Sequence, residues 1–192
     1  ADFVSAPTGP NPDVGSTDVA ITRRTVELDV LFAANPHFTL VVSFADNVIN
    51  VRDYFCYDVM GIPPSTISSQ VKKLSFTGKN LKTIGNWFLE DAKSLISVDF
   101  KGLNSVISVG NSFLSYAESL TSVDFRGLLT LQTVGDRFFH NPHSLISVNL
   151  RGLSTLHTVG NDFFDFAESL TSADFRGLLT LHTVGNDFFH CS

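Results

Sequence analysis

Several features of common protein classes are absent from this chain. No stretch approaches the roughly 20 uninterrupted apolar residues that a membrane-spanning helix needs, and residues 1–20 lack the basic start and apolar core of a signal peptide. Residues 1–70 hold 8 acidic and 3 basic side chains, and residues 71–192 hold 11 and 10, so neither part has a basic excess. Because a phosphate backbone requires a basic surface, we expect no nucleic-acid partner.

The chain does contain an internal repeat. Residues 120–139 and 170–189 differ at only four of twenty positions. Glycine and phenylalanine recur every 25 residues, at Gly85, Gly110, Gly135, Gly160 and Gly185 and at Phe88, Phe113, Phe138, Phe163 and Phe188. A fixed period of this length is typical of a solenoid, whose units bury their apolar faces against one another.

Each repeat unit is predicted to form one coil that contains a short strand. Val98 and Phe100 alternate around Asp99, as in a half-buried strand. The apolar positions of that unit are Leu95, Val98, Phe100, Leu103, Val106, Val109 and Phe113, and they recur as Leu120, Val123, Phe125, Leu128, Leu131, Val134 and Phe138. We therefore expect a parallel sheet built from the segments around Phe76, Phe100, Phe125, Leu150 and Phe175. We also expect tight turns or positive φ at two columns of glycine, the one above and that of Gly102, Gly127, Gly152 and Gly177.

The repeat pattern resembles a known family. The order of the repeat is L-x-x-V-x-F, then Val or Leu, then V-G-x-x-F-F, and the last unit ends in H-C-S. This order is similar to that of the BspA-like leucine-rich repeats of microbial surface proteins. The resemblance covers residues 71–192, although these units are about two residues longer and carry Gly where the family often has Pro. It implies a leucine-rich-repeat solenoid of about five coils, in a secreted or cell-surface protein that binds proteins and mediates adhesion.

The first 70 residues follow a different pattern. Residues 1–22 are rich in Pro, Gly, Ser, Thr and Asp and are predicted to form a flexible arm. Residues 23–70 are predicted to form a small α+β capping module, with strands at 25–33 and 38–45 and a helix over roughly 47–60. The segment DNVINVRDYFCYDVMGIPP, followed by LSFTGKNL, resembles the start of a ubiquitin-like β-grasp domain, and it also fits a small ferredoxin-like module. Either module would cover the apolar end of the first coil.

Polar side chains form columns on the predicted strands. One column is acidic, the next is basic, and a column of serines precedes them: Ser97, Ser122, Ser147 and Ser172; Asp99, Asp124, Asn149 and Asp174; Lys101, Arg126, Arg151 and Arg176. Two interpretations remain open. The columns form either a solvated salt-bridge ladder that keeps the sheet in register or a face that binds a charged protein partner.

A further polar column accompanies the strands without indicating chemistry. It consists of Thr83, Ser108, Thr133, Thr158 and Thr183, and beside it lie Lys82, Ile107, Gln132, His157 and His182. An ice-binding surface would need two paired threonine columns, and two stacked histidines without a carboxylate or Cys are a weak metal motif. Because an active site needs one asymmetric constellation, whereas nearly every Ser, Asp and His here repeats, we expect no catalytic residue, cofactor or metal.

Three functional hypotheses remain open. They are a surface or secreted binding protein, a self-assembling structural protein of an extracellular layer or filament, and an intracellular scaffold or effector module. The chain begins at Ala1, as a processed protein would, which together with the resemblance favours an extracellular location. Cys56 and Cys191 lie at opposite ends of the array and are expected not to reach each other. The last coil keeps the internal pattern, so its strand edge near Phe175 is expected to be open for another chain or for the arm of residues 1–20.

Overall fold

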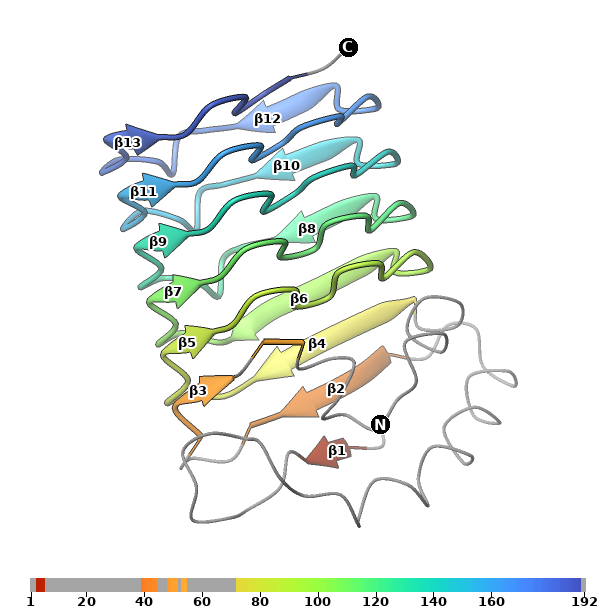
Figure 1. Cartoon of the computed structure of the whole chain (residues 1–192). Coiled ribbons are helices and arrows are strands. Elements are labelled where there is room, and N and C mark those ends of the chain that lie inside the picture. The colour runs from red at the N-terminus through yellow and green to blue at the C-terminus, as the bar shows by residue number, and fades with distance from the viewer. Residues whose placement is uncertain (1–2, 6–38, 45–47, 52, 55–71, 191–192) are drawn as a thin grey trace.

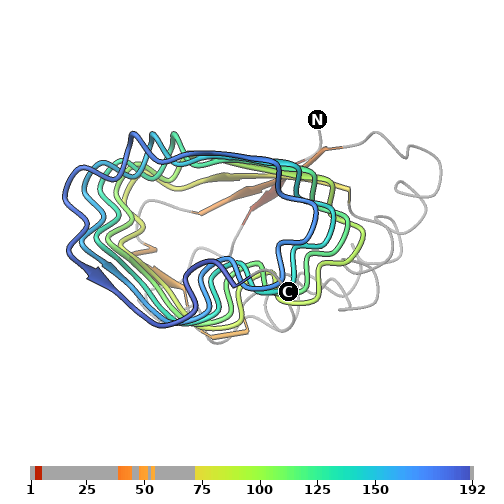
Figure 2. The same cartoon turned by 90° about the horizontal axis from the view of Figure 1, so that it is seen from above.

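Short parallel strands of the repeats form two sheets that share one core (Figures 1 and 2). The computed structural model describes residues 3–5, 39–44, 48–51, 53–54 and 72–190. The first sheet contains, in spatial order, β1 (Phe3–Ser5), β2 (Thr39–Ser43), β4 (Lys73–Thr77), β6 (Ser97–Gly102), β8 (Ser122–Asp124), β10 (Ser147–Asn149) and β12 (Ser172–Asp174). The second contains β3 (Asn50–Val51), β5 (Thr83–Ile84), β7 (Ser108–Val109), β9 (Thr133–Val134), β11 (Thr158–Val159) and β13 (Thr183–Val184).

The chain crosses from the first sheet to the second and back once in each coil. Equivalent residues of successive coils are paired in register, as Val98 is with Val123 and Ile84 is with Val109. The parallel sheet predicted around Phe76, Phe100, Phe125, Leu150 and Phe175 is therefore confirmed as the first sheet. The second sheet was not predicted, because its strands are only two residues long.

The core consists of the apolar columns that the repeat predicted. The seven apolar positions predicted for the 95–113 unit, from Leu95 to Phe113, and their seven equivalents from Leu120 to Phe138 are all at most 6% exposed. The aromatic rings of one column stack along the whole solenoid, with centroid separations of 5.4, 4.9, 5.1 and 5.0 Å for Phe88, Phe113, Phe138, Phe163 and Phe188. Stacking that continues through every coil explains why the phenylalanine repeat is strict.

Close packing between coils requires the glycine columns. The tight turn expected at Gly127, Gly152 and Gly177 is present, whereas the glycines of both columns from Gly102 to Gly185 have no positive φ. A Cβ on Gly127 would lie closer than 3.0 Å to main-chain atoms of Phe100 and Lys101 in the preceding coil. Positive φ falls instead on bulky residues such as Trp87 (56°) and Arg137 (56°). Their N–H groups donate to carbonyls of the next coil at 2.8 Å, and these hydrogen bonds hold the left-handed conformation.

The described residues before position 72 extend the two-strand pattern toward the N-terminus. Strand β2, within the predicted strand 38–45, pairs in parallel with β4, and β3 pairs in parallel with β5. The helix predicted over 47–60 is wrong where the structure describes it, because Asn50–Val51 is a strand. The rest of that helix, the predicted strand 25–33, Cys56, Cys191 and nearly all of the arm lie outside the described residues, so the division at 22 and 70 stays a prediction. In the described part of the chain no helix is long and apolar enough to span a membrane.

Candidate binding face

The predicted site residues all lie on the outer face of the first sheet or directly after its strands. In the coils of β6, β8, β10 and β12 the Asp or Asn accepts a hydrogen bond from the main-chain N–H two residues later, at 2.9 Å for Asp99, 3.0 Å for Asp124 and Asn149, and 3.1 Å for Asp174. This local bond turns the chain out of the strand. Because it needs only a side-chain oxygen, Asn149 fits the column as well as an aspartate does.

Each cation of the basic column pairs with a carboxylate of the acidic column. Lys101, Arg126 and Arg176 pair within their own coil, and Arg151 pairs with the next coil. The Lys101 Nζ lies 3.6 Å from Oδ2 of Asp99, and Arg126 donates hydrogen bonds from its Nε and Nη2 to the Asp124 carboxylate. The acidic position in the coil of Arg151 is occupied by the uncharged Asn149, and the Arg151 Nε lies 2.7 Å from Oδ2 of Asp174 in the next coil. Hydrogen bonds from Arg126 hold the pKa of Asp124 below its ordinary value. The columns thus form a ladder of ion pairs.

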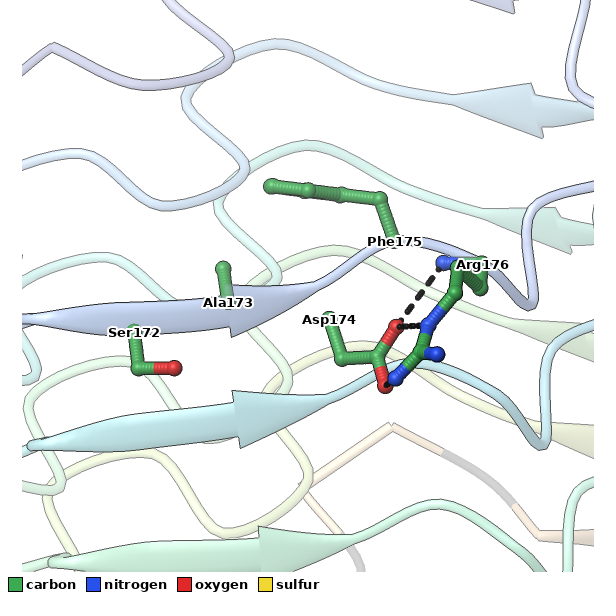
Figure 3. A pocket seen from close by; sticks show the side chains of 5 residues that line it. All are labelled: Ser172, Ala173, Asp174, Phe175 and Arg176. Atoms are coloured by element: carbon green, nitrogen blue, oxygen red, sulfur yellow. Dashed lines mark hydrogen bonds and ion pairs between the residues drawn. The ribbon is translucent and has the colours of Figure 1, made fainter.

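The cations form the outermost layer of this face. The acidic side chains are 39%, 29% and 23% exposed at Asp99, Asp124 and Asp174, whereas the basic ones are 61%, 66%, 50% and 75% exposed at Lys101, Arg126, Arg151 and Arg176. Figure 3 shows this arrangement on β12, where the Arg176 guanidinium extends over the Asp174 carboxylate. A partner that approaches the sheet therefore meets basic groups first.

The last coil leaves apolar side chains uncovered. Phe175 is 42% exposed and Phe189 is 37% exposed, whereas Phe125 and Leu150, which occupy the position of Phe175 in earlier coils, are fully buried. A shallow cavity of about 270 Å³ lies here, lined by Leu170, Thr171, Ser172, Ala173, Phe175 and Phe189. A neighbouring hollow of about 640 Å³ follows the β12 edge from Ser172 to Arg176 (Figure 3). Within the described residues, Phe175 is thus exposed and no further coil covers it.

The threonine column lies on the second sheet, and His157 and His182 directly precede its strands β11 and β13. The rings of His157 and His182 have centroids 5.2 Å apart and are tilted by 39°. Among the described residues, no three His, Cys, Asp or Glu side chains are arranged to hold a metal ion.

One polar column was not recognised from the sequence. It consists of Glu90, Ser115, His140, Asp165 and His190, spaced by 25 residues. Asp165 lies between two histidines, 3.3 Å from Nδ1 of His140 and 3.1 Å from Nδ1 of His190. Burial lowers the pKa of His140, while the Asp165 carboxylate opposes that shift.

The order Ser115, His140, Asp165 matches that of a hydrolase triad, but the serine is not positioned to react. Ser115 is fully buried, and its Oγ donates at 2.6 Å to the carbonyl of Arg137. A nucleophile must reach both its base and a substrate. This column therefore does not form an active site.

A second unrecognised column is a ladder of Asp and Asn side chains, called here the Asx ladder: Asp53, Asn86, Asn111, Asp136, Asn161 and Asn186. The Oδ1 of each of the first five members accepts a hydrogen bond from the main-chain N–H of the next member, at 2.7 to 2.9 Å. The sequence signal was the Asn or Asp that follows each glycine of the Gly85 column. The ladder is structural, because it links every coil to the next.

The fold and its columns define a leucine-rich-repeat solenoid, a class of protein that generally binds other proteins. A family model described as "BspA type Leucine rich repeat region" matches residues 65–192 in six copies, and the chain belongs to this family. The family resemblance stated from the sequence is thus confirmed.

The chain is similar to two solved leucine-rich repeat structures, the first of which shares its fold. The crystal structure of a leucine-rich repeat protein from T. pallidum has a TM-score of 0.50 and 15% identity, over 78% of this chain and 74% of that one. A leucine-rich repeat protein from Bacteroides ovatus has a TM-score of 0.33 and 17% identity, over 78% of this chain and 46% of that one. Among curated proteins, none matches this chain.

Proposed function

We propose that this protein is a secreted or cell-surface adhesion protein that binds a protein partner through the outer face of the first sheet. The observation that supports the proposal most directly is the row of exposed cations, Lys101, Arg126, Arg151 and Arg176, above partly sheltered carboxylates. A broad face with fixed charges gives a partner specificity and speeds its association. The BspA-type repeats support the surface location, because such repeats are typical of microbial surface proteins.

The test is charge reversal on the face with a matched change elsewhere. Beads coated with the full chain are applied to an immobilised panel of extracellular-matrix proteins, and retention is measured at several salt concentrations. Replacing Arg126, Arg151 and Arg176 by Glu is expected to reduce retention and its salt dependence. The control replaces Lys82, Lys93 and Arg137 by Glu, which changes the net charge equally but leaves the face intact.

Two outcomes would refute the proposal. Equal loss of retention in both variants would mean that net charge alone drives the binding. The face variant could instead unfold at a much lower temperature and still bind its partner when folded. That result would mean that the ion pairs stabilise the fold and do not bind the partner. Labelling of intact source cells with an antibody against the solenoid tests the surface location.

A second proposed function is self-association, which the uncovered last coil favours. If two copies meet edge to edge at β12, antiparallel and centred on Phe175, each Asp174 lies opposite the Arg176 of the other copy and the two Phe175 rings meet. Light scattering at increasing concentration tests this. Replacing Ala173 and Phe175 by Asp should abolish the dimer, whereas Asp at the exposed Ile146 on the side of the solenoid should not. A strict monomer at high concentration contradicts self-association.

A further inference from the structure

The charge ladder of the first sheet is incomplete at one rung. Across the coils of β6, β8, β10 and β12 the face carries four cations but three carboxylates, because Asn149 occupies the acidic position of the third coil. Arg151 consequently reaches to the next coil, and Oδ2 of Asp174 lies 2.7 Å from both Arg151 Nε and Arg176 Nη2. One carboxylate thus serves two guanidinium groups, and the excess positive charge is located at Arg151 and Arg176.

The surroundings of these two arginines suit a small anionic group. Ser147 and Ser172 are both exposed and lie on the same face, two residues before Asn149 and Asp174. Their hydroxyls can donate or accept hydrogen bonds. The Arg151 and Arg176 side chains are 50% and 75% exposed. A guanidinium has five N–H donors in a fork that matches a carboxylate, so one Asp174 leaves donor capacity for another.

We propose that the Arg151–Asp174–Arg176 cluster binds a carboxylate side chain from an extended segment of the protein partner, in the place that Asn149 leaves uncharged. The proposal rests on the proposed function, since it specifies the chemistry of the partner on the same face. Charge complementarity selects this occupant. The local excess is a single positive charge on a chain with a net charge of −6, so it fits one Asp or Glu within a mostly neutral segment. A polyanion such as nucleic acid would be repelled by the rest of the molecule.

The geometry also fits an extended segment that runs along the solenoid. Adjacent coils are about 4.8 Å apart in a parallel sheet, and side chains on one side of an extended peptide repeat about every 6.6 Å. The long arginine side chains can accommodate that difference. One carboxylate then bridges Arg151 and Arg176, while neighbouring side chains of the segment contact the serine column.

The test adds the missing carboxylate. Asn149→Asp gives the third coil the residue found at this position in the other three, and so keeps the turn hydrogen bond to the Arg151 N–H. A display library of random linear peptides is selected against the full-length wild-type chain. Affinity for a selected peptide, and for the same peptide with each Glu or Asp replaced by its amide, is then measured by fluorescence anisotropy.

We expect the selected peptides to be enriched in single acidic residues. The Asn149→Asp variant should bind the acidic peptide about tenfold more weakly than the wild type, and Arg151→Gln should show a similar loss. The amide peptide should bind all variants weakly and equally. Gln132→Glu, which adds the same charge on the second sheet, should leave the affinity unchanged. Selected peptides without acidic enrichment, or equal affinity in Asn149→Asp and the wild type, overturn the proposal.

The two proposals fail separately. If charge reversal of the face abolishes adhesion while Asn149→Asp does not weaken acidic peptides, the face binds its partner by other groups. If charge reversal leaves adhesion intact, the proposed function fails whatever the peptides show.

Discussion

Replacing Phe138 by Ala removes a ring from the middle of the aromatic stack. The ring is fully buried, and its centroid lies 4.9 Å from that of Phe113 and 5.1 Å from that of Phe163. Truncation of a buried phenylalanine to alanine costs about 3–5 kcal/mol, with the higher values where the surroundings cannot collapse into the cavity. The coils above and below Phe138 are fixed by hydrogen bonds on both sheets, so we expect about 4–5 kcal/mol.

The loss is measured as a shift in the unfolding transition, followed by circular dichroism in urea and on heating. For a chain of this size each kcal/mol lowers the midpoint by about 2–4 °C, which predicts a fall of about 8–20 °C. Phe188→Ala is the matched control. Phe188 occupies the same column at its end, is only partly buried and stacks on Phe163 alone in that column. A Phe138→Ala midpoint as high as that of Phe188→Ala would refute the argument that stacking from both sides stabilises the core.

Two further predictions concern the coil contacts. Gly127→Ala should destabilise the protein by more than about 2 kcal/mol, because its Cβ meets the Phe100 main chain. Gly78→Ala should cost less, because its Cβ meets only the Phe44 side chain at 3.0 Å; equal midpoints in urea would contradict the steric argument. Burial lowers the pKa of His140 below its ordinary value of 6.5, so the unfolded chain binds more protons below that pH, and the stability present above about pH 6.5 is lost as the pH falls through the lowered pKa. His140→Ser, which introduces the residue of the preceding coil, should flatten the pH dependence of the melting temperature; parallel profiles for His140→Ser and the wild type would show that His140 does not cause the acid loss.

The sequence predicted the repeated core because burial has a clear period. Val98 and Phe100 face inward as expected, and the same alternation recurs in the coils of β4, β8 and β10, whereas Phe175 in the coil of β12 is exposed. For the glycines, the tight turns were predicted correctly at Gly127, Gly152 and Gly177, but the close approach of the preceding coil was not predicted, for a physical reason. A glycine can be required either by backbone conformation or by the lack of space for a Cβ, and only the neighbouring coil reveals which one applies. Positive φ at Trp87 could not be foreseen, because local preference opposes it and inter-coil hydrogen bonds impose it.

The candidate face could be predicted only in part. The columns themselves follow from the strand period, and their position on one sheet agrees with the prediction. The difference in exposure between Asp124 and Arg126 depends on side-chain geometry, as does the sharing of Asp174 by Arg151 and Arg176. The helix expected over 47–60 failed at Asn50 and Val51 because these two residues pair with Thr83 and Ile84 of the next coil, and tertiary pairing overrides the local helix signal there.

The Asx ladder has a mechanical consequence. Its hydrogen bonds, like those of both sheets, run from one coil to the next, so a force that pulls the two ends of the solenoid apart loads the bonds of an outermost coil before those of the interior. Coils would detach one after another, and each would release 25 residues, or about 80–90 Å of extended chain. A protein under such tension would lengthen in equal steps while its remaining coils keep their shape, and would so act as an extensible tether.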